Sequence, residues 1–503
     1  MDKREILSMI RFGQQVAENE IDDLGTYFVE TDHWRRLFAG EIDIVYGSKG
    51  SGKSALYFLL LAREDALLDR GILVAAGENP RGAPAFRDLV ADPPTSEAEF
   101  MGLWKLYFAC LLSDLFAEYG VSGPHATELR HALEQEGLVQ RGRNLQTVLQ
   151  GAFAYVKKAF RPSSIEAGVD VDPLTQLPRS FRGRITFREP VAEIAASGYR
   201  SVDQLLTTAN EALKAEGFAV WLLLDRLDVA FAESGDLEQN ALRALFRVYL
   251  DLRVLDNVQL KVFLRSDIWD QITSAGFREA SHIGRKMTIG WDRPSLLSLV
   301  VSRAARNAIL QELLRTSREE AIQSSGSQER FFYRLFPDQV DVGSRKPRTF
   351  DWMLTRTKDG TGRNAPRELI HFLNSLREVQ VRRLEIGESP PEGESLFSRG
   401  AFKDALPEVS RTRLEQTIYA EYPNLRTRLE ALRRSKTRHT GATLAQVWKV
   451  DVDRAKPMAE ELVEVGFFEQ RGTQERPEYW VPFLYRDALD MVQGTAEESD
   501  TES

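Results

Sequence analysis

One stretch of eight residues carries the clearest chemical signal in this 503-residue chain. It reads Gly47-Ser48-Lys49-Gly50-Ser51-Gly52-Lys53-Ser54 and fits the pattern G-x-x-x-x-G-K-[ST]. In this pattern a glycine-rich loop turns its backbone N–H groups toward phosphate oxygens. The lysine, here Lys53, reaches the outer phosphates of a nucleoside triphosphate, and the hydroxyl group of Ser54 is a ligand for Mg²⁺. The stretch therefore predicts a phosphate-binding loop (P-loop) that holds a nucleotide together with Mg²⁺.

The residues on either side of the loop favour the structural context that the motif requires. Residues 42–46 form a short β-branched stretch that is typical of a buried strand, and residues 55–62 have a helix-forming composition. A helix that begins at the end of the loop adds its positive dipole to the anion site. Strand, loop and helix together make nucleotide binding the firmest prediction from the sequence.

A second strand is predicted to deliver a carboxylate to the same site. The apolar run 220–224 ends in Asp225, which is typical of a Walker B strand. An aspartate in that position holds the Mg²⁺ that the P-loop hydroxyl also ligates. We therefore expect Asp225 and Ser54 to share the metal.

The general base for hydrolysis is less clearly marked. Arg226 stands where many ATPases have the glutamate that activates water. Two acids remain as alternatives, namely Asp228 and Glu78, the latter at the tip of a strand predicted over 71–76. Nucleotide binding is therefore better supported by the sequence than hydrolysis is.

Strands that alternate with helices predict a parallel α/β sheet. The expected strands are residues 42–46, 71–76, 218–224, 259–264 and 286–291. The carboxyl ends of parallel strands face the ligand, so Arg265 or Ser266 is a candidate sensor of the γ-phosphate. Asp267 is expected to cap the helix that follows. Arg278 and Arg285 are candidates for an arginine finger, although a surface role is the stronger interpretation for both.

A later segment extends this prediction to a lid. Residues 362–374 open a helix with Pro366 in its first turn, and Arg367 follows it. The segment resembles the sensor-2 region of AAA+ ATPases, in which an arginine on a helical lid reaches the nucleotide. That resemblance implies such a role for Arg367.

The chain as a whole resembles AAA+/STAND-type P-loop ATPases, and more closely an uncharacterised group of bacterial P-loop ATPases. The residues that carry the resemblance are Ala17–Glu20, Tyr46–Ser54, Phe263–Asp267 and Asn364–Glu368, and the likeness spans most of residues 10–490. It implies an ASCE/AAA+-like P-loop NTPase fold and ATP as the nucleotide. The Asn-Lys-x-Asp base-reading motif expected of a GTPase is absent from the sequence. Some relatives belong to bacterial defence loci.

Composition and resemblance together divide the chain into five predicted parts. These are an N-terminal helical segment (1–40), a P-loop ATPase core (41–292) with a helical and β insertion at about 97–200, a helical lid (293–386), a winged-helix-like domain (397–490) and a disordered acidic tail (491–503). Residues 163–189 suggest a β-hairpin or a long surface loop inside the insertion. Residues 387–395 are expected to be an exposed linker.

The C-terminal part has the pattern of a winged helix. Helices are predicted at 444–448 and 454–465, and a hairpin at 466–482. The second helix, which would enter the major groove of DNA, carries three glutamates. Residues 401–490 hold 15 Lys and Arg against 15 Asp and Glu. The one basic cluster comprises Arg426, Arg428, Arg433, Arg434, Lys436 and Arg438. A solvated helix face is the favoured interpretation of this cluster, ahead of a nucleic-acid patch, and protein docking fits the acidic helix.

The bulk composition narrows the class of protein. The net charge is −9, so no overall basic field attracts nucleic acid or anionic lipid. The single cysteine, Cys110, excludes an intrachain disulfide. The sequence opens without an apolar leader, and we expect a cytoplasmic protein without a membrane segment.

Three functions follow as hypotheses. The first is an ATPase that uses ATP and Mg²⁺ to drive a conformational switch, in a bacterial defence or DNA-associated system. The second is a nucleotide-gated scaffold with little hydrolysis. The third is an initiator-like or loader-like DNA-binding ATPase, although DNA is not the favoured partner. A homo-oligomer and a separate effector protein are the partners that fit the first two hypotheses.

Overall fold

A computed structural model gives the fold. It describes residues 1–28, 30–77, 94, 96–139, 145–160, 184–190, 192–227, 235–274, 276–473 and 475–497. Two compact units emerge, which we name by their content. The sheet unit contains Asp32–Ser48 and Gly52–Ile289, and the helical unit contains Met1–Thr31, Lys49–Ser51 and Gly290–Ser503.

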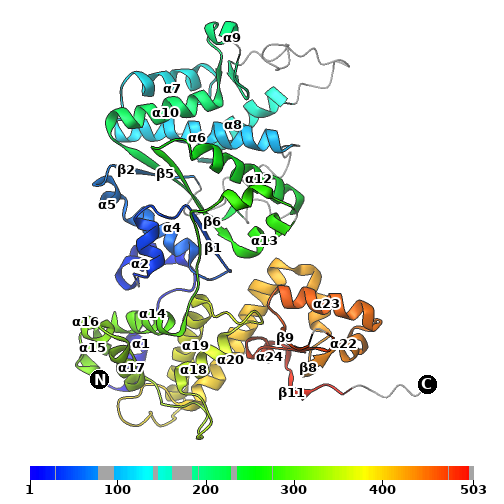
Figure 1. The fold of residues 1–503 in the computed structure, drawn as a ribbon. Helices are drawn as coiled ribbons and strands as arrows, with labels where there is room; N and C mark the ends of the chain where they lie inside the picture. Colours follow the sequence, from blue (N-terminus) through cyan, green and yellow to red (C-terminus); the bar gives the residue numbers. More distant parts are fainter. Residues whose placement is uncertain are drawn as a thin grey trace. The chain divides into compact units, whose positions relative to one another are not determined.

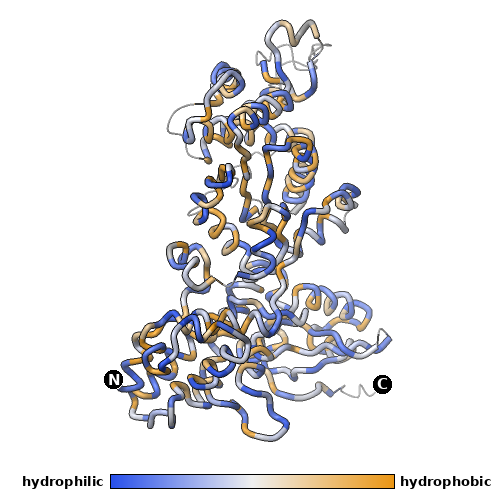
Figure 2. Tube along the Cα trace, turned by 60° about the vertical axis from the view of Figure 1, so that its left-hand side comes forward, coloured by the Kyte–Doolittle hydropathy of each residue, from blue (hydrophilic) through white to orange (hydrophobic). Residues whose placement is uncertain are grey.

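Five parallel strands form the centre of the sheet unit, in the order β2-β5-β6-β1-β7 (Figure 1). Their bounds are β1 Ile44–Gly47, β2 Ile72–Ala76, β5 Ala219–Leu224, β6 Val258–Arg265 and β7 Lys286–Thr288. Figure 2 shows orange, hydrophobic residues along these strands. Such runs are expected where both faces of a parallel sheet are covered. β6 lies between β1 and β5, because Val262 pairs with both Ile44 and Leu224. The predicted α/β P-loop fold is confirmed.

Helices cover this sheet, and several of them pack against one long central helix. The helices of the sheet unit are α3 Asp32–Phe38, α4 Lys53–Ala62, α5 Glu64–Leu68, α6 Glu97–Tyr119, α7 Pro124–Gln135, α8 Leu145–Phe160, α9 Ala192–Ala196, α10 Val202–Glu216, α12 Gly235–Leu252 and α13 Ser266–Ser274. α6 packs against α8, α10 and α12. Among the described residues it is the one helix long and apolar enough to cross a membrane. Its apolar window is 83% buried inside the protein, so its hydrophobicity reflects a central place in the core.

The insertion between α6 and α10 is mainly helical, with one small sheet. Residues 161–183, where a hairpin or surface loop was expected, lie outside the described part of the chain. The strand that follows, β3 Ile185–Thr186, pairs in parallel with β4 Arg200–Ser201. The hydroxyl group of Tyr155 donates to the carbonyl oxygen of Ile185 (3.1 Å) and accepts from its N–H (2.9 Å). A buried tyrosine thus fastens β3 to α8.

The helical unit begins with the N-terminal segment and continues after β7. Its first helices are α1 Lys3–Met9, α2 Ile21–Tyr27, α14 Arg293–Ala305, α15 Ala308–Leu314, α16 Arg318–Ile322, α17 Ser325–Leu335, α18 Thr349–Thr357, α19 Pro366–Glu385 and α20 Arg399–Arg413. Trp352, Phe372 and Phe402, from α18, α19 and α20, meet with ring centroids 6.0–6.2 Å apart. One continuous hydrophobic core therefore joins the region expected as a lid to the region expected as a separate module.

The C-terminal part confirms the predicted winged-helix arrangement. Its elements are α21 Arg426–Glu430, β8 Lys436–Thr440, α22 Gly441–Trp448, α23 Val452–Glu464, β9 Glu469–Gly472, β10 Pro477–Trp480, α24 Phe483–Arg486 and β11 Val492–Thr495. Four strands pair in the order β11-β8-β10-β9. β8 was not predicted, because its residues are all polar. Thr437 and His439 nevertheless alternate into the interior.

The C-terminal tail and the linker at 387–395 both make contacts that their predicted lack of structure did not include. β11 falls inside the tail 491–503 that was expected to be disordered, because backbone bonds hold it to β8 without any apolar pattern. Residues 387–395 are largely exposed, as expected of a linker. However, the amine of Lys3 donates to three of their carbonyl oxygens at 2.6–2.7 Å. The N-terminal helix therefore fastens this segment.

Candidate functional site

The P-loop connects β1 to α4 through two glycines with left-handed backbone. β1 ends at Gly47 and α4 begins at Lys53. Gly50 has φ +80° and Gly52, the N-cap of α4, has φ +100°, a region that residues with a side chain rarely adopt. The amine of Lys53 donates to the carbonyl oxygens of Gly47 (2.8 Å) and Ser48 (3.1 Å). The loop thus curves around the lysine, in the strand–loop–helix context that the sequence predicts.

The second predicted metal ligand lies at the same edge of the sheet. Asp225 directly follows β5 and is 3% exposed. In the neighbouring register Gly47 pairs with Arg265 at the end of β6. Because all three strands run in parallel, their carboxyl ends meet at the ligand edge. A carboxylate such as that of Asp225 and a hydroxyl such as that of Ser54 are oxygen ligands of the kind that Mg²⁺ prefers, so these two residues could hold the metal.

Neither of the two candidates for the general base is described by the structure. Glu78 and Asp228 lie outside the described residues. Arg226, between Asp225 and the undescribed segment, has the left-handed backbone angle φ +57°. A residue with a side chain in that conformation marks a sharp turn immediately after the Walker B strand.

Arg265 lies at the ligand edge but is engaged by a neighbour. Its guanidinium group donates to both carboxylate oxygens of Asp267, at 3.1 and 2.5 Å. α13 already begins at Ser266, so Asp267 lies in the first turn. Asp267 is therefore an acidic residue of the first turn, and its carboxylate holds Arg265.

The two candidate arginine fingers lie elsewhere. Arg285 precedes β7, and its guanidinium is 3.1 Å from the carboxylate of Asp43, which precedes β1. This position is at the amino ends of the strands, the edge opposite the P-loop. Asp43 also accepts from the buried amine of Lys261 at 2.8 Å, and burial lowers the pKa of Lys261 to about 8. Arg285 thus belongs to a structural charge cluster. Arg278 lies in the 3₁₀ helix Arg278–His282.

The tip of the P-loop, Lys49–Ser51, belongs to the helical unit and contacts several of its residues. The indole N–H of Trp291 donates to the carbonyl oxygen of Ser51 at 2.7 Å. Gly50 lies against Arg367, since a Cβ at Gly50 would stand 3.0 Å from the Cβ of Arg367. The amine of Lys49 forms an ion pair with Glu421. The roles of Trp291 and Glu421 were not predicted, because nothing in their local sequence pattern marks them.

Arg367 is presented by a rigid helix start. Pro366 occupies the first turn of α19, as predicted. The adjacent Glu368 is buried and accepts from Arg413 of α20 at 2.6 Å. The Nε of Arg367 is buried and has no hydrogen-bond partner among the described residues. The sensor-2 candidate therefore stands beside the P-loop tip with a donor still to be satisfied.

Adding a methyl group at Gly50 is expected to weaken nucleotide binding by at least about tenfold, since alanine resists φ +80° and its Cβ would crowd Arg367. Gly25→Ala is the matched control: Gly25 lies in α2 with open space around its α-carbon. Isothermal titration with Mg²⁺·ATP measures both variants. Equal affinities for the two variants would contradict a binding role for the loop tip.

Half of the basic cluster of the C-terminal part is paired with carboxylates within the protein. Arg428 pairs with Glu461 of α23, and Arg438 pairs with Glu478 of β10. Arg433 lies 2.9 Å from Glu430 and 3.1 Å from Asp490. Arg426 lies over the ring of Tyr419, 5.0 Å from its centroid. Three of the six basic residues are thus paired with carboxylates, whereas Arg434 and Lys436 are exposed.

Comparison with known proteins gives distant matches only. No protein-family model matches the chain, and no curated protein matches its sequence. The ORC1 protein of Aeropyrum pernix, solved in complex with DNA, is 13% identical, with a TM-score of 0.37, over 95% of this chain and 96% of that one. The ORC2 protein of Aeropyrum pernix, solved in ADPNP–ADP complexes, is 11% identical, with a TM-score of 0.30, over 91% of each chain. At such scores the fold assignment rests on the strand order and the P-loop of this chain itself.

Proposed function

We propose that the protein is an ATPase that binds ATP with Mg²⁺ at residues 47–54 and couples the nucleotide to a conformational switch. The observation that carries this proposal is the P-loop: two left-handed glycines and a lysine at the start of a helix, at the carboxyl edge of a parallel sheet. Backbone N–H groups and a helix N-terminus converge on phosphate in such a loop.

Each residue of the proposed site has a separate role. Lys53 neutralises the outer phosphates. Ser54 and Asp225 would hold Mg²⁺, which would supply further positive charge to offset that of the phosphates. Asp228 or Glu78 orients the attacking water. Arg265 and Arg367 respond to the γ-phosphate, Arg265 by leaving Asp267 and Arg367 through its buried, unsatisfied Nε.

The switch is proposed to start at the loop tip. Gly50 lies against Arg367, and Lys49 pairs with Glu421 beyond the π-helix Leu414–Tyr419. Short π-helical segments are frequent at functional sites. A phosphate that reorders the tip would therefore alter its contacts with the region that leads into the winged helix.

A nucleotide-gated scaffold is the second candidate, and Arg226 is the observation that favours it. The usual water-activating glutamate is replaced by an arginine directly after Asp225. Such a protein would bind ATP, change conformation and turn over slowly, and a separate effector would then carry out the downstream chemistry.

Calorimetry and turnover distinguish these functions. The wild-type chain is titrated with ATP in Mg²⁺, ATP in EDTA, and GTP, and steady-state phosphate release is then measured with and without double-stranded DNA. We expect Mg²⁺-dependent binding of ATP and measurable release. Tight binding without release would favour the scaffold, and strong stimulation by DNA would favour the initiator-like alternative. Absence of ATP binding would contradict both proposals.

A further inference from the structure

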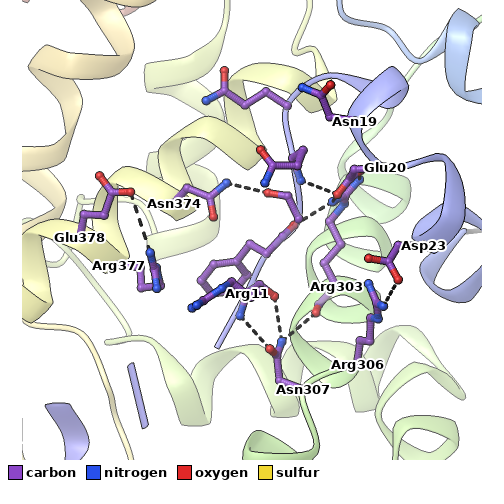
Figure 3. A pocket seen from close by; sticks show the side chains of 14 residues that line it. Arg11, Asn19, Glu20, Asp23, Arg303, Arg306, Asn307, Asn374, Arg377 and Glu378 are labelled. Carbon is purple, nitrogen blue, oxygen red and sulfur yellow. Dashed lines mark hydrogen bonds and ion pairs between the residues drawn. The ribbon is translucent and has the colours of Figure 1, made fainter. Parts of the chain in front are cut away.

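A second candidate site, a polar pocket, lies within the helical unit, and none of its lining residues belongs to the P-loop. It has a volume of about 650 Å³ and lies between the N-terminal segment 11–23, the end of α14 and the middle of α19 (Figure 3). This volume is within the range of pockets that enclose small-molecule ligands, about 300–1,000 Å³. Its lining is predominantly polar, with arginine, asparagine and glutamine side chains.

Hydrogen bonds within the protein hold the wall of this pocket in place. Arg303 of α14 makes a two-pronged contact with Glu20, at 3.0 and 2.9 Å, and also donates to the carbonyl oxygen of Phe12 at 2.8 Å. Asn374 of α19 donates to the carbonyl oxygen of Gly13 at 2.8 Å. Asn307 accepts from the N–H of Arg11 and donates to its carbonyl oxygen. The segment that forms the wall is therefore fixed to both helices.

The charges that line the pocket do not balance. Glu20 matches Arg303, and Asp23 matches Arg306. Arg11, Arg377 and Glu378 remain, which leaves an excess of one positive charge. Both arginines point an N–H toward the carbonyl oxygen of Ile10, at 2.9 and 3.5 Å. Arg11 also donates to the carbonyl oxygen of Ser8 at 2.7 Å, and Arg377 to that of Leu7 at 3.5 Å. The hydrogen bonds of both guanidinium groups in this pocket therefore end on neutral carbonyl oxygens.

Arg377 is the more exceptional of these two cations. The nearest carboxylate, that of Glu378, is 3.9 Å away on a side chain that is 71% exposed. The Nε of Arg377 is buried and has no hydrogen-bond partner in the described part of the chain. Burial, and then the charge of Arg11, lower the pKa of Arg377. An anion in the pocket would relieve both effects and satisfy the orphaned donor.

We propose that this pocket binds a small phosphate-bearing anion, independently of the nucleotide at the P-loop. The planar fork of a guanidinium group matches the geometry of phosphate oxygens and makes paired hydrogen bonds to them. The amides of Gln15 and Asn19 line the same pocket and can donate to further oxygens. The limited volume of the pocket favours a compact ligand over the extended backbone of a nucleic acid.

The test uses the full chain with Lys53→Ala, so that the P-loop contributes little to the signal. Inorganic pyrophosphate is the probe, measured by isothermal titration calorimetry. Arg377→Ala is expected to weaken binding at least about tenfold, and Arg377→Lys to recover part of the loss. Arg382→Ala is the matched control, because Arg382 is an exposed arginine on the same helix.

Glu378→Gln tests the proposal without touching a buried group. Removing this exposed carboxylate is expected to tighten pyrophosphate binding about two- to fivefold, because the carboxylate of Glu378 competes with pyrophosphate for Arg377. If the affinity for pyrophosphate were unchanged in both Glu378→Gln and Arg377→Ala, the proposal would be overturned. It would also be overturned if Arg382→Ala lost as much affinity for pyrophosphate as Arg377→Ala. A short DNA duplex is expected not to compete with pyrophosphate, and competition would assign the site to nucleic acid instead. Since every variant carries Lys53→Ala, these outcomes are separate from those of the ATPase proposal.

Discussion

Lys53→Ala is expected to weaken Mg²⁺·ATP binding at least about a hundredfold and to reduce ATP turnover to background. A hundredfold loss corresponds to about 2.7 kcal/mol, which is the scale of a charge-assisted contact to phosphate. In the structure the amine of Lys53 is already drawn to the start of the loop by the carbonyl oxygens of Gly47 and Ser48. The loop therefore holds the lysine in place before a nucleotide binds, and little side-chain entropy remains to be lost.

Lys49→Ala is the control for this prediction, because Lys49 is the other lysine of the same loop. Its amine pairs with Glu421 and not with the start of the loop. We expect its ATP affinity to fall by less than about tenfold. Calorimetry and phosphate release are measured on both variants, and circular dichroism verifies the fold. Equal losses in the two variants would refute a specific phosphate contact by Lys53.

The sheet and the P-loop could be predicted because their signals are local. The apolar run that ends in Asp225 marks a buried strand, and the glycine spacing around Lys53 marks the loop. Pro366 marks the start of α19 in the same way, because its missing N–H suits the first turn of a helix. Each of these signals lies within about ten residues, so the sequence alone contains them.

The contacts that surround the loop tip could not be predicted in the same way. Trp291 lies 240 residues from Ser51 along the chain, and Lys49 reaches a carbonyl oxygen 367 residues away. Such pairings depend on how the chain returns to itself, which periodicity does not encode. β11 was missed because main-chain bonds hold it to β8, and these leave no trace in side-chain composition.

The charged clusters illustrate a further limit of sequence reasoning. The run from Arg426 to Arg438 is dense in positive charge, yet its partners include Glu461 and Glu478, which are distant in sequence. Counting charges in a segment therefore overstates the field it presents. Conversely, Arg11 and Arg377 are far from each other in the sequence and come together only in the fold.

Glu20→Ala is expected to lower the free energy of unfolding of the helical unit by about 3–5 kcal/mol. Both Glu20 and Arg303 are buried, with side chains 5% exposed, so removal of the carboxylate leaves a guanidinium without its countercharge. The same carboxylate accepts from the N–H of Gln14, and a Cβ at Gly13 would stand only 2.1 Å from it. The chain passes too close to this pair for solvent to replace the lost bonds without rearrangement.

Asp23→Ala supplies the matched control, because Asp23 forms an ion pair with Arg306 on the same two segments. That pair is exposed, at 56% and 39% of the two side chains, and we expect a change within about 1 kcal/mol. Urea unfolding of the full chain, followed by tryptophan fluorescence, measures both. The double variant Glu20→Leu with Arg303→Leu is expected to be more stable than Glu20→Ala, because it removes the stranded charge as well as the pair. If Glu20→Ala were no worse than Asp23→Ala, the buried pair would not be what fixes the N-terminal segment, and the wall of the second pocket would have to be held by the asparagine contacts alone.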